Sequence, residues 1–359
     1  MNLLDIGFYE KISEIKKQLT KEKISYPKTE LYDILEENRN MNPVVYNIET
    51  TNNCNMNCFM CPRPTKMTRK VMDMPMDIFE KTITQIHPWS NLEWYQWKHF
   101  VEQYYNIKQN DMSENHFFLY IIPKVLVLHG YGEPLIDKHI VERVERCTEL
   151  DIPSYFSCNP WNLKNTEQGI KLMDAGLDYI KFSTDSADDF SIKQIRGKQA
   201  NFSDSFNKIK QLIKLKEENS YETTIVITML DLNRKNNISD FERLKQKFQN
   251  LDVYIYLKSQ DQLWYDETGA KTGSIHWIEP CQFPWSSMTV KSNGECCQCV
   301  EDYNNEIILG DVNSQPLWEI WNSEKYRQLR WMHIKANHGW DAKCNKECDM
   351  RLIGEYTYG

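Results

Sequence analysis

The residues of this chain that are best suited to chemistry are three cysteines near its start, Cys54, Cys58 and Cys61. They are spaced C-x3-C-x2-C and follow an apolar run at 44–48 that is typical of a β-strand. Three thiolates this close together can hold three irons of a cubane iron–sulfur cluster, and the fourth iron then stays open. Ferredoxin-type electron carriers supply four cysteines per cluster, so an open iron indicates chemistry at the cluster rather than electron storage alone.

The alternatives for this triad are a zinc site or a chance grouping. Zinc sites usually combine a C-x2-C unit with a second pair of Cys or His. The next group of cysteines begins only at Cys281, and six of the eleven cysteines of the chain lie between 281 and 348. Disulfides are rare in a reducing compartment, so metal ligation is the better explanation for so many cysteines.

Composition excludes several classes of function. The chain has 359 residues and a net charge of −8, with no basic block of the kind that follows phosphates, which argues against nucleic-acid partners. No apolar run is long enough to span a membrane, and the first residues lack the pattern of a signal peptide. We therefore expect a cytoplasmic protein with no membrane partner.

The elements that must position the triad alternate along the chain, which predicts an α/β fold with a parallel sheet. Strands are expected at 44–49, 124–129, 153–157, 179–183, 224–229 and 252–257, with helices at 75–86, 138–149, 166–174, 203–217 and 239–249. Six such units without a closing pair predict a partial (β/α)6 TIM-like barrel. In parallel barrels the reacting groups lie at the C-terminal ends of the strands. Five candidate residues follow a predicted strand: Cys54, Gly132, Cys158, Ser183 and Asp185.

The sequence predicts three further parts around this barrel, which itself covers 44–260. Residues 1–43 are expected to form an N-terminal helical extension, 261–280 a linker, and 281–359 a small cysteine-rich domain. An insertion at 87–122, rich in aromatic residues, separates the first helix from the second strand. Two interpretations stay open for it: an extra helix packed on the barrel, or a lid or wall over a substrate pocket.

Taken together, these motifs resemble the radical SAM superfamily. The segment "NCNMNCFMCPR" is similar to the subgroup with a C-terminal SPASM domain, and "HGYGEPL", "FSCNP", "FSTDS" and "QIRG" follow in the order the family shows. Cys158 and Pro160 depart from the S-T-N-G pattern of many relatives. The resemblance implies a set of residues that bind S-adenosylmethionine (SAM): Met60, Gly132, Glu133, Pro134, Asn159, Ser183, Asp185 and Arg196.

The resemblance also implies an activity. A [4Fe–4S] cluster on Cys54, Cys58 and Cys61 would bind SAM at its open iron and cleave it reductively to a 5′-deoxyadenosyl radical, which abstracts a hydrogen atom from the substrate. The cofactor supplies this chemistry and the protein supplies orientation. A flavodoxin or ferredoxin-type electron donor is the expected partner. Cys158, after a strand, is a candidate hydrogen-atom donor to a substrate radical, although a buried structural cysteine is the simpler interpretation.

The C-terminal segment resembles the SPASM/twitch pattern. Cys281, Gly294 and Cys299 are followed by an "LGD" segment, a "WEIWN" helix and "CNKEC", which holds Cys344 and Cys348. The resemblance implies one auxiliary [4Fe–4S] cluster on Cys281, Cys299, Cys344 and Cys348, since six cysteines are too few for two fully ligated clusters. Cys296 or Cys297 could replace Cys299, and a zinc ribbon is the alternative to the cluster.

Two substrate classes stay open. The short helical N-terminal part favours a polar small molecule of sugar or cyclitol type, which is oxidised or epimerised, because peptide-modifying relatives often carry a larger N-terminal recognition domain. A peptide or protein side-chain maturase is the alternative within the family. An iron–sulfur electron carrier without catalytic activity is the alternative of another class, and it would need neither SAM-binding motifs nor a barrel.

Overall fold

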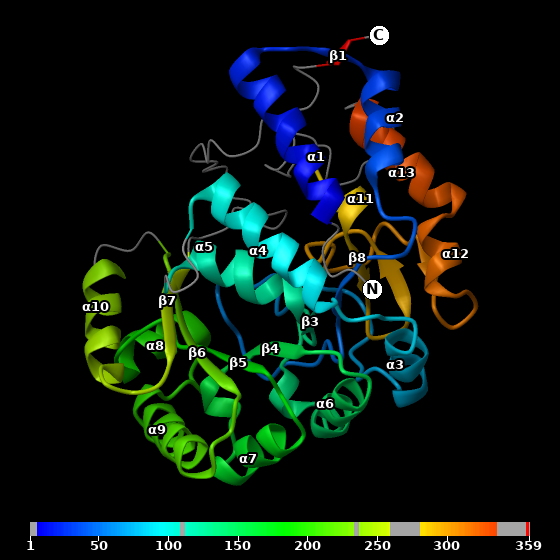
Figure 1. Cartoon of the computed structure of the whole chain (residues 1–359). Helices are drawn as coiled ribbons and strands as arrows, with labels where there is room; N and C mark the ends of the chain where they lie inside the picture. The colour runs from blue at the N-terminus through cyan, green and yellow to red at the C-terminus, as the bar shows by residue number, and fades with distance from the viewer. Residues whose placement is uncertain (1–5, 108–111, 233–236, 259–280, 336–356, 359) are drawn as a thin grey trace.

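The computed structural model describes residues 6–107, 112–232, 237–258, 281–335 and 357–358. A nine-stranded sheet runs through the molecule in the order β10-β9-β8-β2-β3-β4-β5-β6-β7. Six consecutive parallel strands of this sheet form the predicted partial barrel (Figure 1): β2 (Val45–Ile48), β3 (Leu126–Val127), β4 (Ser154–Cys158), β5 (Tyr179–Ser183), β6 (Thr224–Leu230) and β7 (Tyr254–Lys258). All six coincide with strands expected from the sequence.

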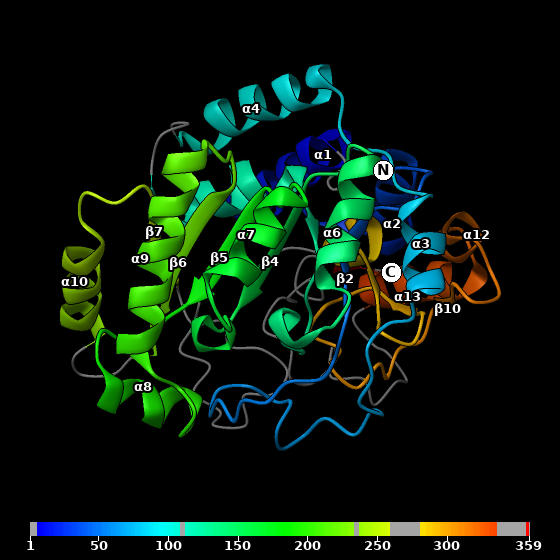
Figure 2. The same cartoon turned by 90° about the horizontal axis from the view of Figure 1, so that it is seen from below.

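Helices between these strands cover the outer face of the sheet, as right-handed β-α-β crossovers require. Figure 2 shows α6, α7 and α9 side by side in front of the strands. Their apolar residues pack on the outward-facing residues of the strands, such as Phe156 and Phe182, in one large core. The outer helices are α3 (Met76–Ile83), α6 (Ile140–Glu149), α7 (Thr166–Asp174), α8 (Asp189–Arg196), α9 (Phe202–Asn219) and α10 (Asn237–Phe248).

Alternation along the strands separates this outer core from the barrel interior, because successive side chains of a strand point to opposite faces. Tyr155 and Val226 belong to a second apolar cluster, inside the barrel. Phe117, Ile121 and Ile122 of the insertion belong to the same interior cluster. Beyond its α4 helix (Asn91–Tyr105), the insertion forms α5 (Glu114–His116), a π turn (Phe117–Ile121) and a 3-10 turn (Ile122–Lys124).

The insertion therefore closes the end of the barrel at which the strands begin. Its α4 helix packs Trp97 and Val101 together with Tyr120, and Tyr9 of the first helix joins this cluster. Figure 2 shows α4 at one end of the strands and α8 at the opposite end. The insertion packs as an extra element of the scaffold, away from the cysteine loop, and this placement favours the first of the two interpretations left open by the sequence.

The N-terminal segment is helical, as expected, with α1 (Ile6–Lys17), a π turn (Gln18–Glu22) and α2 (Lys28–Asn38). Its buried residues Phe8, Ile12, Leu31 and Leu35 share an apolar cluster with Trp285 and with Ile334 of α13 (Glu324–Lys335). A short parallel pair joins β1 (Tyr26–Pro27) to β11 (Thr357–Tyr358). None of the helices in the described ranges combines the length and the apolar composition that crossing a membrane demands.

The C-terminal segment continues the barrel sheet, which the sequence did not predict. After α11 (Phe283–Ser286), β8 (Met288–Val290) pairs in parallel with β2, and β9 (Glu295–Cys297) pairs antiparallel with β8. Gly294 has a φ of +90° in the turn between β8 and β9, where a side chain would be strained. β10 (Gly310–Asp311) and α12 (Leu317–Trp321) follow. The predicted linker, 261–280, lies outside the described residues.

Candidate active site

The cysteine triad lies on the loop that follows β2, where the strand-end rule predicts it. Cys58 is buried, and Cys54 and Cys61 are partly buried. Burial raises the pKa of Cys54 to about 12 and that of Cys61 to about 11, with the charge of Cys58 contributing to both rises. Cys58 therefore lies near enough to Cys54 and Cys61 for its charge to act on both, although the described residues contain no three such ligands already gathered as in a metal site. A cationic cluster would stabilise the thiolates that burial disfavours, so the donor set fits an iron–sulfur cluster.

Arg196, at the C-terminal end of α8, ties this loop to two strand ends. Its Nη1 lies 3.7 Å from Cys58 Sγ and donates to Asn159 Oδ1 at 3.0 Å. Its Nε donates to Asp185 Oδ2 at 2.5 Å. The Asp185 side chain is buried and also accepts from the backbone N–H of Leu230 at 2.8 Å. The arginine predicted from the family motif is thus central to the site and not a surface ion pair.

Asp185 also stands in an unusual backbone conformation. Its φ of +46° lies in the left-handed region, which residues with a side chain rarely occupy. Such strain persists where the surrounding contacts hold it, and it concentrates at functional sites. The contacts to Arg196 and to the Leu230 N–H hold Asp185 in this position.

Glu133 joins the β3 and β4 ends to the cysteine loop. Its carboxylate accepts from the Asn159 N–H at 2.8 Å, from the Asn159 side-chain amide and from the Leu135 N–H at 3.1 Å. Its own N–H donates to the Asn53 carbonyl at 2.8 Å. Burial raises the pKa of this carboxyl, and the hydrogen bonds from Asn159 oppose the rise. Glu133 therefore organises backbone and amide groups around the loop rather than facing solvent.

Glycine is required beside Glu133 because the two segments touch. A Cβ built on Gly132 would lie 2.1 Å from the carbonyl oxygen of Thr51, and backbone cannot move away as a flexible side chain can. Pro134 opens the short 3-10 turn Pro134–Ile136 that follows. The Gly-Glu-Pro motif is therefore packed directly on the chain segment that leads into the triad.

The remaining predicted SAM-binding residues are distributed around this centre. Ser183 ends β5 and its Oγ lies 3.1 Å from Ser157 Oγ on β4. Met60 is partly buried and packs on the main core. Cys158 is buried in the outer core, on the face of β4 opposite to Ser157, with its Sγ 3.6 Å from the Lys181 carbonyl. Its role as a hydrogen donor stays a prediction, and its orientation favours the structural interpretation.

Inside the barrel, the sequence analysis missed two titratable side chains, Lys181 and His129. Lys181 is 8% exposed, and its Nζ lies over the rings of Phe117 and Tyr155, 5.4 and 5.7 Å from their centroids. His129 Nδ1 accepts from the Ser157 N–H at 3.2 Å. Lys181 could have been found from periodicity, because it stands two residues before Ser183 on the same predicted strand and must share its face.

The auxiliary cysteines are described in part. Cys281, Cys296, Cys297 and Cys299 are all buried. Cys297 Sγ lies 3.3 Å from the carbonyl oxygen of Cys299, whereas Cys296 belongs to the main apolar core. Of the two spare cysteines, Cys297 is therefore the one beside the predicted ligand Cys299. Cys344 and Cys348 lie outside the described residues, so the complete ligand set stays a prediction.

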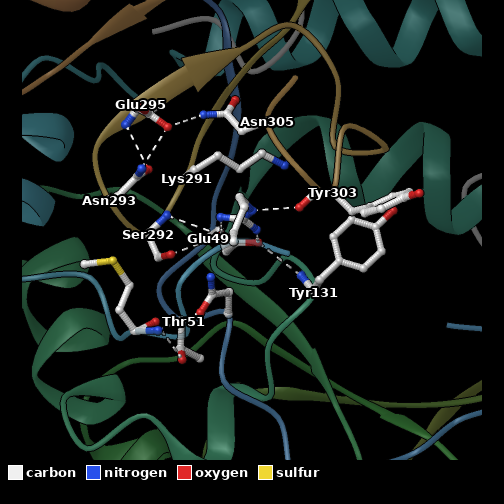
Figure 3. Close-up of polar contacts among 12 residues, drawn as sticks. Glu49, Thr51, Tyr131, Lys291, Ser292, Asn293, Glu295, Tyr303 and Asn305 are labelled. Atoms are coloured by element: carbon white, nitrogen blue, oxygen red, sulfur yellow. Dashed lines mark hydrogen bonds and ion pairs between the residues drawn. The ribbon is translucent and has the colours of Figure 1, made fainter. Parts of the chain in front are cut away.

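A buried ion pair links the barrel to the cysteine-rich segment. Glu49, at the end of β2, accepts two bonds of 2.8 Å from Arg69 and further bonds from the N–H and hydroxyl of Ser292, at 3.3 and 3.2 Å. In Figure 3, Ser292 and the backbone nitrogen of Tyr131 approach Glu49 from opposite sides, and the Tyr131 ring turns away toward Tyr303. Burial pushes the pKa of Glu49 up, but the charges of Lys291 and Arg69 together hold it below its usual value. Glu49 and Arg69 belong to no recognised motif, so this pair was not predicted from the sequence.

Comparisons with known proteins agree with this geometry. The Radical SAM superfamily model matches residues 48–246, and the model of the SPASM iron–sulfur cluster-binding domain matches 281–349. A curated relative, the S-adenosyl-L-methionine-dependent 2-deoxy-scyllo-inosamine dehydrogenase of Niallia circulans, is 28% identical over 69 residues. This match covers 19% of the chain and 27% of the relative, which is well under half of either protein.

Solved structures with a similar fold include two enzymes. Streptococcus suis SuiB bound to S-adenosylmethionine has a TM-score of 0.53 at 12% identity, over 89% of this chain and 73% of SuiB. BtrN in complex with AdoMet and 2-DOIA has a TM-score of 0.48 at 15% identity, over 87% of this chain and 96% of BtrN. The likeness to SuiB concerns the fold alone.

Proposed function

Because this chain belongs to the radical SAM superfamily and carries a SPASM domain, we propose that it abstracts hydrogen from a polar small molecule of sugar or cyclitol type and thereby oxidises or epimerises it. The family implies a [4Fe–4S] cluster, SAM and an auxiliary iron–sulfur centre. Enzymes of this superfamily act on small molecules or on peptides. When bound, the cluster and SAM together supply a radical that takes a hydrogen atom from the substrate.

One observation carries the catalytic part of the proposal. Arg196 contacts Cys58, Asp185 and Asn159 at once, and Asn159 is bonded to Glu133. Side chains from three strand ends thus converge on the loop that would hold the cluster. An electron carrier needs only the cysteines, so this convergence supports an enzyme over the non-catalytic alternative. In this arrangement the residues around the triad hold one another in place before any ligand binds, which lowers the cost of orienting SAM.

The substrate class is supported by two further observations. Hydrogen-bonding side chains line the C-terminal half of the barrel interior, including Ser157, Ser183 and Lys181, and polyols need such partners. The curated relative that matches 69 residues acts, by its name, on a cyclitol amine. We infer that this chain positions a polyhydroxylated ring in the barrel interior, between the rings of Phe117 and Tyr155 and the C-terminal ends of the strands.

The test is anaerobic reconstitution followed by two assays. Dithionite-reduced protein should convert SAM to 5′-deoxyadenosine, and the triple variant Cys54→Ala, Cys58→Ala, Cys61→Ala should not. The wild type should hold about eight irons per chain, and the triple variant about four. About four irons plus one zinc in the wild type would reject the auxiliary cluster, and absence of SAM cleavage would reject the enzyme.

The substrate class is tested by deuterium transfer. Ring-deuterated myo-inositol, glucose, glucuronate and 2-deoxy-scyllo-inosamine are offered in turn, and 5′-deoxyadenosine is analysed by mass spectrometry. Deuterium in this product from at least one of the four compounds supports the proposal. SAM cleavage without deuterium from any of the four, together with transfer from a deuterated peptide, would identify a peptide maturase instead.

A further inference from the structure

Lys181 carries a buried amine that forms no ion pair with a carboxylate in the described part of the chain. Its side chain comes from the middle of β5, faces the barrel interior and is 8% exposed. Among the described residues, its Nζ forms no hydrogen bond or ion pair, and its contacts are the faces of Phe117 and Tyr155. Two partly buried arginines near the site do have a carboxylate partner: Arg196 pairs with Asp185 and Arg69 with Glu49.

An unpaired buried charge is costly, and proteins retain one where it serves a purpose. The aromatic faces recover part of the cost, because a ring attracts a cation over its centre. The rings supply no oxygen or nitrogen acceptor over their faces. The N–H donors of the Lys181 Nζ are therefore available to a ligand. Burial lowers its pKa to about 7, as expected for an ammonium that lacks a counter-ion.

Lys181 lies in the barrel interior, two residues before the C-terminal end of β5. In the sheet register it lies beside Ser157 of β4 and Val226 of β6. Ser183, two residues further on, faces the same side and marks the end of β5. A ligand held between the strand ends and the rings of Phe117 and Tyr155 would therefore contact the hydroxyls of Ser157 and Ser183 first. The Lys181 amine lies deeper in the barrel.

The local charge also favours an acidic ligand. The charges of Lys258 and Arg196 act on the pKa of Lys181 in the same sense as burial, whereas those of Glu114 and of Asp185, which is engaged by Arg196, oppose it. His129, another buried titratable group of the interior, is held neutral because burial and the charge of Lys181 together lower its pKa to about 3. Among these groups the cations Lys181, Lys258 and Arg196 outnumber the carboxylates Asp185 and Glu114 by one.

We propose that Lys181 is a substrate-binding residue that pairs with an anionic oxygen of the substrate, so that the substrate is a sugar or cyclitol acid rather than an amine-bearing cyclitol. This inference rests on the proposed function and specifies its substrate class. The Lys181 ammonium contributes charge-assisted hydrogen bonds, while Ser157 and Ser183 bind hydroxyl groups on the same ring. A ring amine in this position would be repelled.

The experiment compares two matched sugars, D-glucuronate and D-glucose, which differ by one carboxylate. Calorimetric titration is carried out on the reconstituted, SAM-loaded protein without reductant, so that no turnover occurs. We expect glucuronate to bind more tightly than glucose by about tenfold or more, the strength of one charge-assisted hydrogen bond. Equal affinities in the wild type, or no binding of either sugar, would overturn the proposal before any variant is made.

The variant Lys181→Met keeps the length and apolar stem of the side chain and removes the amine. We expect it to lose the preference for glucuronate while SAM affinity stays unchanged. Lys214→Met, at a lysine whose side chain is 74% exposed, is the matched control and should bind as the wild type. An unchanged preference in Lys181→Met would refute the assignment. Should that variant fail to fold, loss of the wild-type preference above about pH 8, where the amine is neutral, replaces it as the readout.

Failure of this inference is separable from failure of the proposed function. Deuterium transfer from 2-deoxy-scyllo-inosamine without any glucuronate binding would keep the reaction class and reject the role of Lys181. Glucuronate binding that depends on Lys181, without deuterium transfer from any of the four ring compounds, would keep the acid-binding site and reject the proposed reaction.

Discussion

Replacing Lys181 by methionine should change how the stability of this protein depends on pH. The side chain is charged at low pH inside an apolar and aromatic environment, and burial lowers its pKa from 10.5 to about 7. In the unfolded chain the amine keeps its ordinary pKa. Between these two values the unfolded chain binds the proton and the folded chain does not, so the stability of the wild type rises with pH across this interval.

The magnitude follows from the two pKa values. Each tenfold difference in proton affinity is worth about 1.4 kcal/mol, so the full penalty below pH 7 is on the order of 5 kcal/mol. Between about pH 6.5 and about pH 9.5, the wild type should gain about 3 kcal/mol of unfolding free energy relative to Lys181→Met. The charged groups whose influence reaches Lys181 are included in this pKa: Lys258, Asp185, Arg196 and Glu114.

Paired urea unfolding of the two proteins at several pH values measures this difference under anaerobic conditions. Equal slopes against urea confirm that the same surface is exposed in both proteins, so the shift in midpoint reports stability. Subtracting one profile from the other removes every titration that the two proteins share. Lys214→Met should run parallel to the wild type. Parallel profiles for Lys181→Met as well would show that Lys181 is not a buried amine, and the argument for its role would fall with it.

Three further predictions concern the contacts around the triad. Gly132→Ala places a methyl group against the Thr51 carbonyl and should weaken SAM binding by tenfold or more, which corresponds to about 1–3 kcal/mol. Equilibrium dialysis measures this affinity. In the control Gly169→Ala the methyl meets only the flexible Leu212 side chain, so SAM affinity should stay unchanged. Glu49→Gln should lower the unfolding free energy by about 3 kcal/mol, because it leaves the partly buried Arg69 without its counter-ion, whereas Glu167→Gln, at a pair in solvent, should leave the urea midpoint unchanged. Asp185→Asn should raise the dissociation constant of SAM by about tenfold through release of Arg196, with iron content unchanged; equal SAM affinity would show that this pair is only structural.

Much of the barrel was predictable because its signals are local. An apolar run of five residues, a polar residue after it and an amphipathic helix beyond can all be recognised within some thirty residues of sequence. Alternation of such units permits few topologies once right-handed crossovers are required. For this reason the six parallel strands and the placement of Cys54, Ser183 and Asp185 at their ends followed from the chain alone.

Other contacts could not be predicted, because they join residues distant in sequence. Ser292 meets Glu49 only because β8 pairs with β2, and nothing in the short β8 segment specifies which strand edge it will join. The insertion could have covered either mouth of the barrel, and packing of Phe117 against the interior rings of Tyr155 and Tyr256 decided which one.

By itself, the sequence determined the chemistry that the protein can carry, since thiols at C-x3-C-x2-C spacing on one loop can share a cluster whatever surrounds them. The tertiary structure decided what surrounds them. It placed Arg196 and Glu133 around the triad, and it turned Lys181 into the barrel interior, where no carboxylate of the described ranges forms an ion pair with it. The physical reason is that ligand spacing along a loop is a local covalent property, whereas burial and charge pairing are set only when distant segments pack.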